Sequence, residues 1–427
     1  MNYTAKEVLQ FTIENDVKFI RLAFSDLYGV IKNLSIMPSE LEKAFTYGID
    51  FDATAISGFG HNATILKLKP DPTTLSVLPW RPSQGRVIRM YCHLFDFNGL
   101  PYRGDFRNQL IETTRLLETY NLQAKIGIEC EFYLFELDDK GYATTTPHDK
   151  AAYFDIAPRD RGENVRRDIC LTLETMGVSP LTSHHERGPG QHEISLKFSS
   201  PLSAADQFLT FKSVVKMIAE RNGLHASFMP KPLKDSHGSG MHINFSLYKE
   251  SQNLFNHFNK DVAKPFSENL ICHLPDLSIF INPLTNSYAR IRSQLLHSAD
   301  PSNERAWLRL ITANDDTSRL EIRSSDATLN PYIVFNMLIR AGLDVIISSE
   351  EKKNKPHFDL TAILNTMPTS LESALAIAEN SVFLKQHVPD DYLSEYLKVK
   401  RSESSRVEQS NDHHDQEIAY YFDGSFT

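Results

Sequence analysis

The segment "IGIECEFYLFE", from Ile126 to Glu136, constrains the fold most, because it is an apolar strand that carries two acids two residues apart. Side chains alternate along a strand, so Glu129 and Glu131 project to one face while Cys130 points to the other. Two strand rises place the two carboxylates about 7 Å apart. The apolar flanks predict a half-buried strand, in which two neighbouring charges need a compensating partner.

Further acids follow on or beside other predicted strands. Glu186 and Glu193 flank a Gly-Pro-Gly turn in "SHHERGPGQHEISLKF", and a hairpin there would bring both carboxylates to one edge of a sheet. His242 comes directly after a glycine-rich loop in "GSGMHINFS". The strand "RLEIR" places two arginines around one acid on a single face, namely Arg319, Glu321 and Arg323.

These motifs together supply five carboxylates and one histidine. Burying such charges without compensation costs several kcal/mol per ion. Oxygen-rich ligands favour Mg²⁺ or Mn²⁺ over zinc, and one histidine shifts the preference towards Mn²⁺. A site in which carboxylates bind two cations, with arginines opposite them to offset phosphate charge, indicates phosphoryl transfer from a nucleotide. Each motif taken alone is also typical of a solvated strand face, so the prediction depends on their joint order.

The chain has 427 residues, which predicts two domains. A helix over 5–15, strands from 17 and from 30, and the proline-rich run "KPDPTTLSVLPWRP" indicate a small α+β unit that ends near residue 104. Strands and helices alternate after it. The tail from Pro368 is predicted to be helical, with the polar run 402–417 on a solvated surface.

The composition excludes several classes of protein. A net charge of −9 without a basic block argues against nucleic acid as a partner. The four cysteines show no CxxC spacing, so neither a disulfide framework nor a zinc knuckle is indicated. There is no apolar stretch of about 18 residues and no signal-peptide pattern, which predicts a soluble cytoplasmic protein with no membrane partner. At this size an enzyme is favoured over a binding module.

The order of the motifs resembles the glutamine synthetase family along nearly the whole chain. The matching segments include "FSDLYGVIKN", "GIDFDATAISGFG", "DPTTLSVLPWRP", "GIECEFYLF", "SHHERGPGQHEI", "FMPKPLKDSHGSGMHINFSL", "NSYAR" and "RLEIRSSDATLNPY". The resemblance implies an α+β fold, with a β-grasp-like domain over 1–104 and a catalytic domain with a curved antiparallel sheet over 105–427. It also implies a homo-oligomer of two stacked rings, usually twelve subunits, whose active sites lie between neighbours.

The resemblance further implies that ATP phosphorylates the side-chain carboxylate of glutamate, after which ammonia or an amine displaces phosphate. Two or more Mg²⁺ or Mn²⁺ ions would serve each site. One cation, on the glutamate side, would be held by Glu131, Glu186 and Glu193. The other, on the ATP phosphates, would be held by Glu129, His242 and Glu321.

Other positions carry over from the same resemblance. Arg319 and Arg323 would lie near the phosphates and the transferred group. Arg309 and Arg290 would serve the nucleotide and the substrate carboxylate. The remaining assignments are Gly238 for the amino-acid backbone, Asp52 for binding and deprotonating ammonium, and Ser246 and Tyr153 around the nucleotide and the ammonium pocket.

The sequence departs from the family's pattern on the acceptor side. His237 replaces the usual asparagine before "GSGMH", and the loop after Arg292 is about four residues shorter and lacks the family's glutamate. Glu304 stands at an arginine position, unless the shorter loop shifts Arg305 into it. Three hypotheses follow: an ordinary glutamine synthetase, a γ-glutamyl ligase for a larger amine or another carboxylate, and a non-catalytic ligand-binding relative. The complete set of six metal-ligand positions favours an enzyme.

Overall fold

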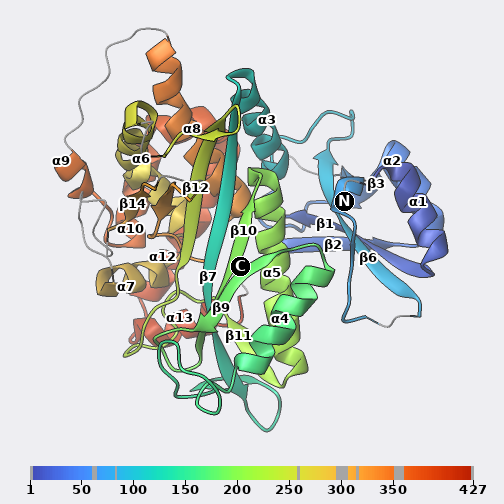
Figure 1. The fold of residues 1–427 in the computed structure, drawn as a ribbon, viewed down its shortest axis with the longest axis horizontal. Coiled ribbons are helices and arrows are strands. Elements are labelled where there is room, and N and C mark those ends of the chain that lie inside the picture. The colour runs from blue at the N-terminus through green and yellow to red at the C-terminus, as the bar shows by residue number, and fades with distance from the viewer. Residues whose placement is uncertain are drawn as a thin grey trace.

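The computed structural model describes residues 3–59, 65–81, 84–256, 260–294, 306–313, 317–350 and 360–424. Two β-sheets organise them: the smaller lies towards one end of the long axis of the molecule, and the larger lies nearer its middle (Figure 1). The smaller sheet, drawn in blue, carries the first strands of the chain. The long strands of the larger sheet run through the middle of the second unit, with helices around them.

The N-terminal sheet has six strands in the order β2-β1-β6-β4-β3, with β5 paired to β6. Only the pairing of β1 with β6 is parallel among these described strands. Their bounds are β1 (Val17–Ser25), β2 (Ile31–Ile36), β3 (Ile49–Asp52), β4 (Ile65–Pro70), β5 (Ser76–Val77) and β6 (Arg86–Phe95). Two helices accompany the sheet, α1 (Ala5–Glu14) and α2 (Leu41–Tyr47). The predicted helix and the two predicted strands at the start of the chain are confirmed.

The second sheet has nine strands, with the main order β14-β15-β12-β7-β10-β9. All of its described pairings are antiparallel. The strands are β7 (Leu122–Leu137), β8 (Ala143–Pro147), β9 (Pro180–His185), β10 (Gln191–Ser199), β11 (Leu224–Ser227), β12 (Met241–Lys249), β13 (Gln252–Asn253), β14 (Leu308–Ile311) and β15 (Arg319–Ile322). The long central strand β7 contains the paired acids Glu129 and Glu131, and β9–β10 is the predicted hairpin.

Helices cover one face of this sheet. The helices α3 (Phe106–Thr119) and α5 (Pro201–Arg221) pack against β7, and α8 (Pro331–Glu350) packs against both of them. Cys130, Ile194 and Ile243 point to this side, and each is fully buried in the largest hydrophobic cluster. Because side chains alternate, the acids beside these residues must point to the opposite face. The remaining helices are α4 (Glu163–Thr175), α6 (Lys260–Ile281), α7 (Thr285–Gln294), α9 (Leu360–Leu364), α10 (Leu371–Asn380), α11 (Val382–His387), α12 (Asp390–Glu408) and α13 (His413–Tyr421).

Buried polar contacts join the two units. Arg107 on α3 donates to Asp71 of the N-terminal unit at 2.8 Å and to Asp206 on α5 at 2.8 Å. The helical tail is confirmed, but the prediction that 402–417 lies on a solvated surface is wrong in part. Val407 and Glu417 are buried because α12 and α13 pack against each other and against α7. None of the helices in the described part of the chain is long and apolar enough to cross a membrane.

Candidate active site

Strand register gathers the predicted acids on the face of the second sheet opposite the helices. Antiparallel pairing fixes which residues of neighbouring strands lie side by side. The pairs are Glu131 with Glu193, Glu129 with His242, and Glu321 with Asn244. Four strands, β10, β7, β12 and β15, therefore contribute to one continuous polar surface.

The first cluster consists of Glu129, His242 and Glu321, whose potential ligand atoms all lie within 4.8 Å of one another. His242 Nδ1 lies 3.2 Å from Glu129 Oε2 and 3.6 Å from Glu321 Oε1. Burial favours a higher pKa for Glu129, but hydrogen bonds from His242 and Asn244 outweigh it and hold the pKa below its usual value. The three residues predicted to hold one cation therefore converge, and their metal binding stays a prediction.

Two arginines compensate the most buried acid of this cluster. Glu321 is 3% exposed, and it accepts from Arg323 Nη1 at 2.7 Å and from Arg309 Nη1 at 3.1 Å. Arg319 is the first residue of β15, and its Nε donates to Asn244 Oδ1 at 2.8 Å. Asn244 in turn donates to Glu129 at 3.0 Å, so it links the arginine to the acid cluster. No sequence motif indicates Asn244, whose position opposite Glu321 depends on strand register.

The second cluster brings together the predicted Glu186 and Glu193 with His184, a residue that no sequence motif indicates. His184 Nε2 lies 3.3 Å from Glu186 Oε1 at the end of β9. The "SHH" run is typical of a solvated loop, and only the β9–β10 pairing, which sets His184 opposite Glu193, reveals its position. Glu131, the third residue predicted for this cation, faces Glu193 from β7.

Negative charge is poorly compensated at this second cluster. Burial, followed by the charges of Glu131, Glu129 and Glu186, raises the pKa of Glu193 to about 9. Burial also raises the pKa of Glu131, and Glu186 adds to that effect. Glu131 Oε2 accepts from Gln191 Nε2 at 2.9 Å and from the Gly240 backbone N–H at 3.0 Å. Without a cation, Glu193 therefore favours its protonated form at neutral pH.

A buried aspartate supports the hairpin that carries the second cluster. Asp149 is 4% exposed, and its Oδ1 accepts from the Gly190 N–H at 2.8 Å and from His185 Nε2 at 3.0 Å. It also accepts from the N–H groups of Ala151 and Arg161. The other nitrogen of His185 lies 2.7 Å from the backbone oxygen of Glu186. One carboxylate therefore fixes both ends of the turn between Glu186 and Glu193, and no sequence motif indicates this role.

Glycines let a buried arginine approach the polar surface. A Cβ on Gly238 would lie 2.6 Å from the Pro230 carbonyl oxygen, and one on Gly240 would lie 2.5 Å from Arg290 Nη2. Arg290 is 2% exposed and donates to the carbonyl oxygens of Ser324 and Arg323 at 2.7 and 2.9 Å. The predicted Gly238 and Arg290 therefore lie against each other, at the edge of the acid clusters.

The segment that leads into this glycine loop is held by the last described helix. Asn286 on α7 is fully buried and accepts from the Lys231 N–H at 2.6 Å. Its side-chain amide donates to the Lys231 carbonyl oxygen at 3.2 Å and to Glu417 Oε2 on α13 at 2.7 Å. Helix α13 thus positions the backbone that leads into the loop at Gly238.

Three other predicted residues occupy different surroundings. Ser246 is 1% exposed and donates to the Ser318 carbonyl oxygen at 2.9 Å, so its hydroxyl proton is used in a hydrogen bond within the protein. Tyr153 is half exposed and its ring meets that of His184 at 5.7 Å, which places it beside the second cluster. Asp52 ends β3 in the N-terminal unit, is exposed, and accepts from Thr54. Figure 1 shows β3 on the far side of the molecule from β7 and β12, so one chain does not bring Asp52 to the clusters.

The positions that depart from the family pattern are only partly covered. His237 is exposed, and its backbone oxygen accepts from Tyr133 at 2.6 Å. Burial and the charges of Arg187 and Lys231 lower the pKa of the His237 imidazole. Glu304 and the shortened loop after Arg292 lie outside the described residues.

Two family models match the chain. The model for the catalytic domain of glutamine synthetase matches residues 103–421, and the model for its β-grasp domain matches residues 16–97. The chain belongs to the glutamine synthetase family. The predicted fold, an N-terminal β-grasp domain followed by a catalytic domain with a curved antiparallel sheet, is confirmed, and so is the resemblance that implies it.

Relatives match over nearly their full length. A glutamine synthetase of Clostridium saccharobutylicum is 37% identical over 94% of this chain and 95% of its own. A glutamine synthetase of Methanosarcina mazei is 37% identical over 94% of each chain. This family member is therefore an ATP-dependent ligase of the glutamine synthetase type, which joins glutamate to ammonia or an amine, as predicted.

Solved structures share the fold. A glutamine synthetase of Plasmodium falciparum has a TM-score of 0.82 at 22% identity, covering 98% of this chain and 99% of that one. GmaS without ligand has a TM-score of 0.82 at 27% identity, over 96% and 97% of the two chains. A GmaS/ADP complex has a TM-score of 0.81 at 26% identity, over 98% and 99%.

Proposed function

We propose that the two clusters hold divalent cations, Mg²⁺ or Mn²⁺, and that each cluster serves one substrate of the ligase. Both clusters are rich in carboxylate oxygen and contain one imidazole, a donor set that suits these ions. The raised pKa of Glu193 supports the assignment, because it reflects negative charge that the chain itself leaves uncompensated. Bound cations would supply Lewis acidity and neutralise phosphate charge at this surface.

The first cluster is proposed as the nucleotide side. Arg309, Arg319 and Arg323 surround Glu321 and Asn244, and their guanidinium groups are placed to offset phosphate charge as the terminal phosphoryl group of ATP moves to glutamate. Positioning and charge compensation supply most of the catalysis in such transfers. The GmaS/ADP complex, which shares this fold at 26% identity, supports nucleotide binding by this chain.

The second cluster, with Gly238 and Arg290, is proposed as the glutamate side. Glu186 and Glu193 are assigned to the cation there, with His184 beside them, and Glu131 is assigned to it from the register position opposite Glu193. Gly238 and Arg290 lie against each other beside this cluster, and we assign both to the amino-acid backbone of glutamate. Phosphorylation converts the poor electrophile of the glutamate side chain into an acyl phosphate, from which an amine expels phosphate.

We further propose that residues 1–104 and 105–427 form the two domains of a cytoplasmic ring oligomer with active sites between neighbours, the dodecamer of the family. The position of Asp52 supports shared sites, because its own chain keeps it away from the clusters. In such a ring the N-terminal domain of one subunit supplies Asp52 to the ammonium pocket of the next, beside Tyr153.

The proposal rests on the convergence of five predicted metal ligands into two clusters, with the sixth, Glu131, opposite Glu193 in strand register. The test is phosphate release from ATP with glutamate and ammonia, in the presence of Mg²⁺ or Mn²⁺. We expect Glu321→Ala and Glu131→Ala to lose nearly all activity, on the order of 10³-fold or more, while the oligomer stays assembled. Glu118→Gln, at an exposed site on α3, serves as the control. Full turnover in either alanine variant would overturn the metal assignment.

A γ-glutamyl ligase acting on a larger amine is the second candidate, favoured by His237, by the shortened loop after Arg292 and by Glu304. The same phosphate assay with a panel of amines separates the two candidates. We expect an organic amine to support faster release than ammonia, with controls that omit the amine or omit glutamate. Ammonia as the best acceptor would select the ordinary glutamine synthetase instead.

A further inference from the structure

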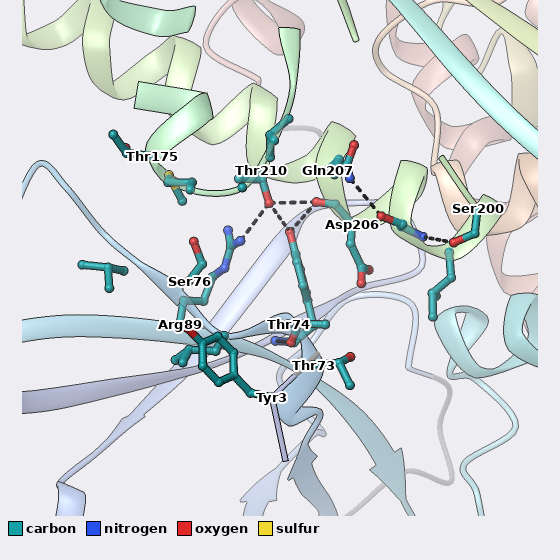
Figure 2. Close-up of a pocket in the computed structure, with 18 of the residues that line it drawn as sticks. Tyr3, Thr73, Thr74, Ser76, Arg89, Thr175, Ser200, Asp206, Gln207 and Thr210 are labelled. Atoms are coloured by element: carbon teal, nitrogen blue, oxygen red, sulfur yellow. Dashed lines mark hydrogen bonds between the residues drawn. The ribbon is translucent and has the colours of Figure 1, made fainter. Parts of the chain in front are cut away.

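A large cavity lies between the N-terminal sheet and the catalytic unit, away from the acid clusters. It has a volume of about 730 Å³, within the usual range for small-molecule sites. Figure 2 shows its walls: β5 and β6 on one side, and the first turns of α5 with the end of α4 on the other. Hydroxyl groups line it throughout, from Thr73, Thr74, Ser76, Thr175, Ser200 and Thr210. The residues assigned to the active site do not contribute to its lining.

A buried guanidinium projects into this cavity. Arg89 on β6 is 7% exposed, and its Nη2 donates to Thr210 Oγ1 on α5 at 2.8 Å. Its charge also lies over the ring of Tyr91, 4.6 Å from the centroid. Arg89 Nε is buried and has no hydrogen-bond partner, and no acid in the described part of the chain lies within ion-pair distance of Arg89. Because a buried cation without a counter-ion is costly, this arrangement favours the binding of an anion.

A second unpartnered donor lies beside it. Ser76 on β5 is the register partner of Arg89, is 7% exposed, and its Oγ is buried without a hydrogen bond. The neighbouring Arg107 also has a buried Nη1 without a hydrogen bond, but Asp71 and Asp206 already neutralise its charge. Glu174 at the rim is exposed, so water screens its charge. The guanidinium charge without an acidic partner is therefore that of Arg89, next to the unpartnered hydroxyl of Ser76.

We propose that this cavity is a binding site for a small anion that carries a carboxylate or a phosphate group, with Arg89 Nε and Ser76 Oγ as its donors. The planar guanidinium matches the oxygens of either group. Because Arg89 already bonds to Thr210, an anion held here would tie β5 and β6 to α5. The site would thus couple the N-terminal domain to the catalytic domain from a position separate from the metal clusters.

The experiment is a calorimetric titration of the full-length protein with inorganic phosphate and, separately, with citrate, in excess EDTA to suppress cation-dependent binding. We expect saturable binding of at least one anion, and the stronger of the two identifies the group. Arg89→Met should weaken it by about tenfold or more and Ser76→Ala by a few-fold, since each removes one donor. Arg89→Lys should retain part of the affinity, because the charge remains.

The matched control is Arg221→Met, which removes an arginine that lines a different cavity at the far end of α5. It should bind as the wild type does. The absence of binding of either anion to the wild type would overturn the proposal. So would binding that Arg89→Met and Ser76→Ala leave unchanged, because the anion would then lie elsewhere. If Arg89→Met does not fold, Ser76→Ala and Arg89→Lys still test the same two donors.

Discussion

Replacing Glu193 with glutamine tests how the uncompensated negative charge of the second cluster affects the stability of the metal-free protein. In the metal-free protein, burial and the neighbouring Glu131, Glu129 and Glu186 raise the pKa of Glu193 to about 9, from an ordinary value of 4.5. The folded protein therefore keeps a proton at this site at neutral pH, and the unfolded chain does not. Glutamine has nearly the same shape and cannot release a proton.

The sign and size of the effect follow from proton linkage. Between about pH 5 and pH 9 the folded state binds up to one proton more than the unfolded state, so the free energy of unfolding falls as the pH rises. The stabilisation is complete below the unfolded pKa and is lost as the pH passes through the folded pKa. The slope reaches about 1.4 kcal/mol per pH unit, and the coupled glutamates share it. Glu193→Gln should lack this part of the slope.

Urea unfolding in EDTA, measured from pH 5 to pH 9 at one protein concentration, compares the two slopes. Glu118→Gln, which changes an exposed carboxyl on α3, should keep the wild-type slope. Addition of Mn²⁺ at pH 7 should also release more protons from the wild type than from Glu193→Gln, because ligands lose protons when they bind a cation. Equal pH slopes in the wild type and the glutamine variant would refute the electrostatic description of the cluster.

Two further substitutions test the supports of the active site. Asp149→Asn leaves four hydrogen-bond donors with a neutral acceptor in place of a carboxylate. We therefore expect the unfolding free energy to fall by about 2–4 kcal/mol and kcat for phosphate release to decrease. An unchanged kcat would show that the hairpin needs no such support. Gly240→Ala places a Cβ 2.5 Å from Arg290 Nη2, and the hydrogen bond from this nitrogen to the Arg323 carbonyl oxygen holds it in place. We therefore expect the free energy of unfolding to fall by about 1–3 kcal/mol and the KM for glutamate to rise. Wild-type kinetics in this variant would contradict the tight packing.

Much of the fold is predictable from alternation and turn signals. Strand period and the Gly-Pro-Gly turn predict that Glu129 and Glu131 share a face and that Glu186 and Glu193 flank a hairpin, because both features are local. The convergence of the four strands is predicted only through the family resemblance. Strand order depends on tertiary packing, which a pattern in one segment does not encode.

Several functional residues are not predictable from the sequence for the same reason, because their positions depend on tertiary packing. His184 is typical of a surface loop until β9 pairs with β10, and Asp149 lies in a segment with no motif, although four donors converge on its carboxylate. The hydrophilic composition of the tail predicts that it faces solvent. Glu417 is nonetheless buried, since Asn286 supplies a hydrogen bond that offsets the loss of water.

That last contact makes distant parts of the chain depend on one another. Glu417 accepts from Asn286, and Asn286 holds the backbone at Lys231, from which the glycine loop departs. Proteolytic clipping ahead of α13, or a bulky fusion that displaces this helix, would break the connection without touching any acid of the two clusters. A preparation damaged there would resemble an active-site mutant in its kinetics, so intact mass should be checked before any loss of turnover is attributed to chemistry.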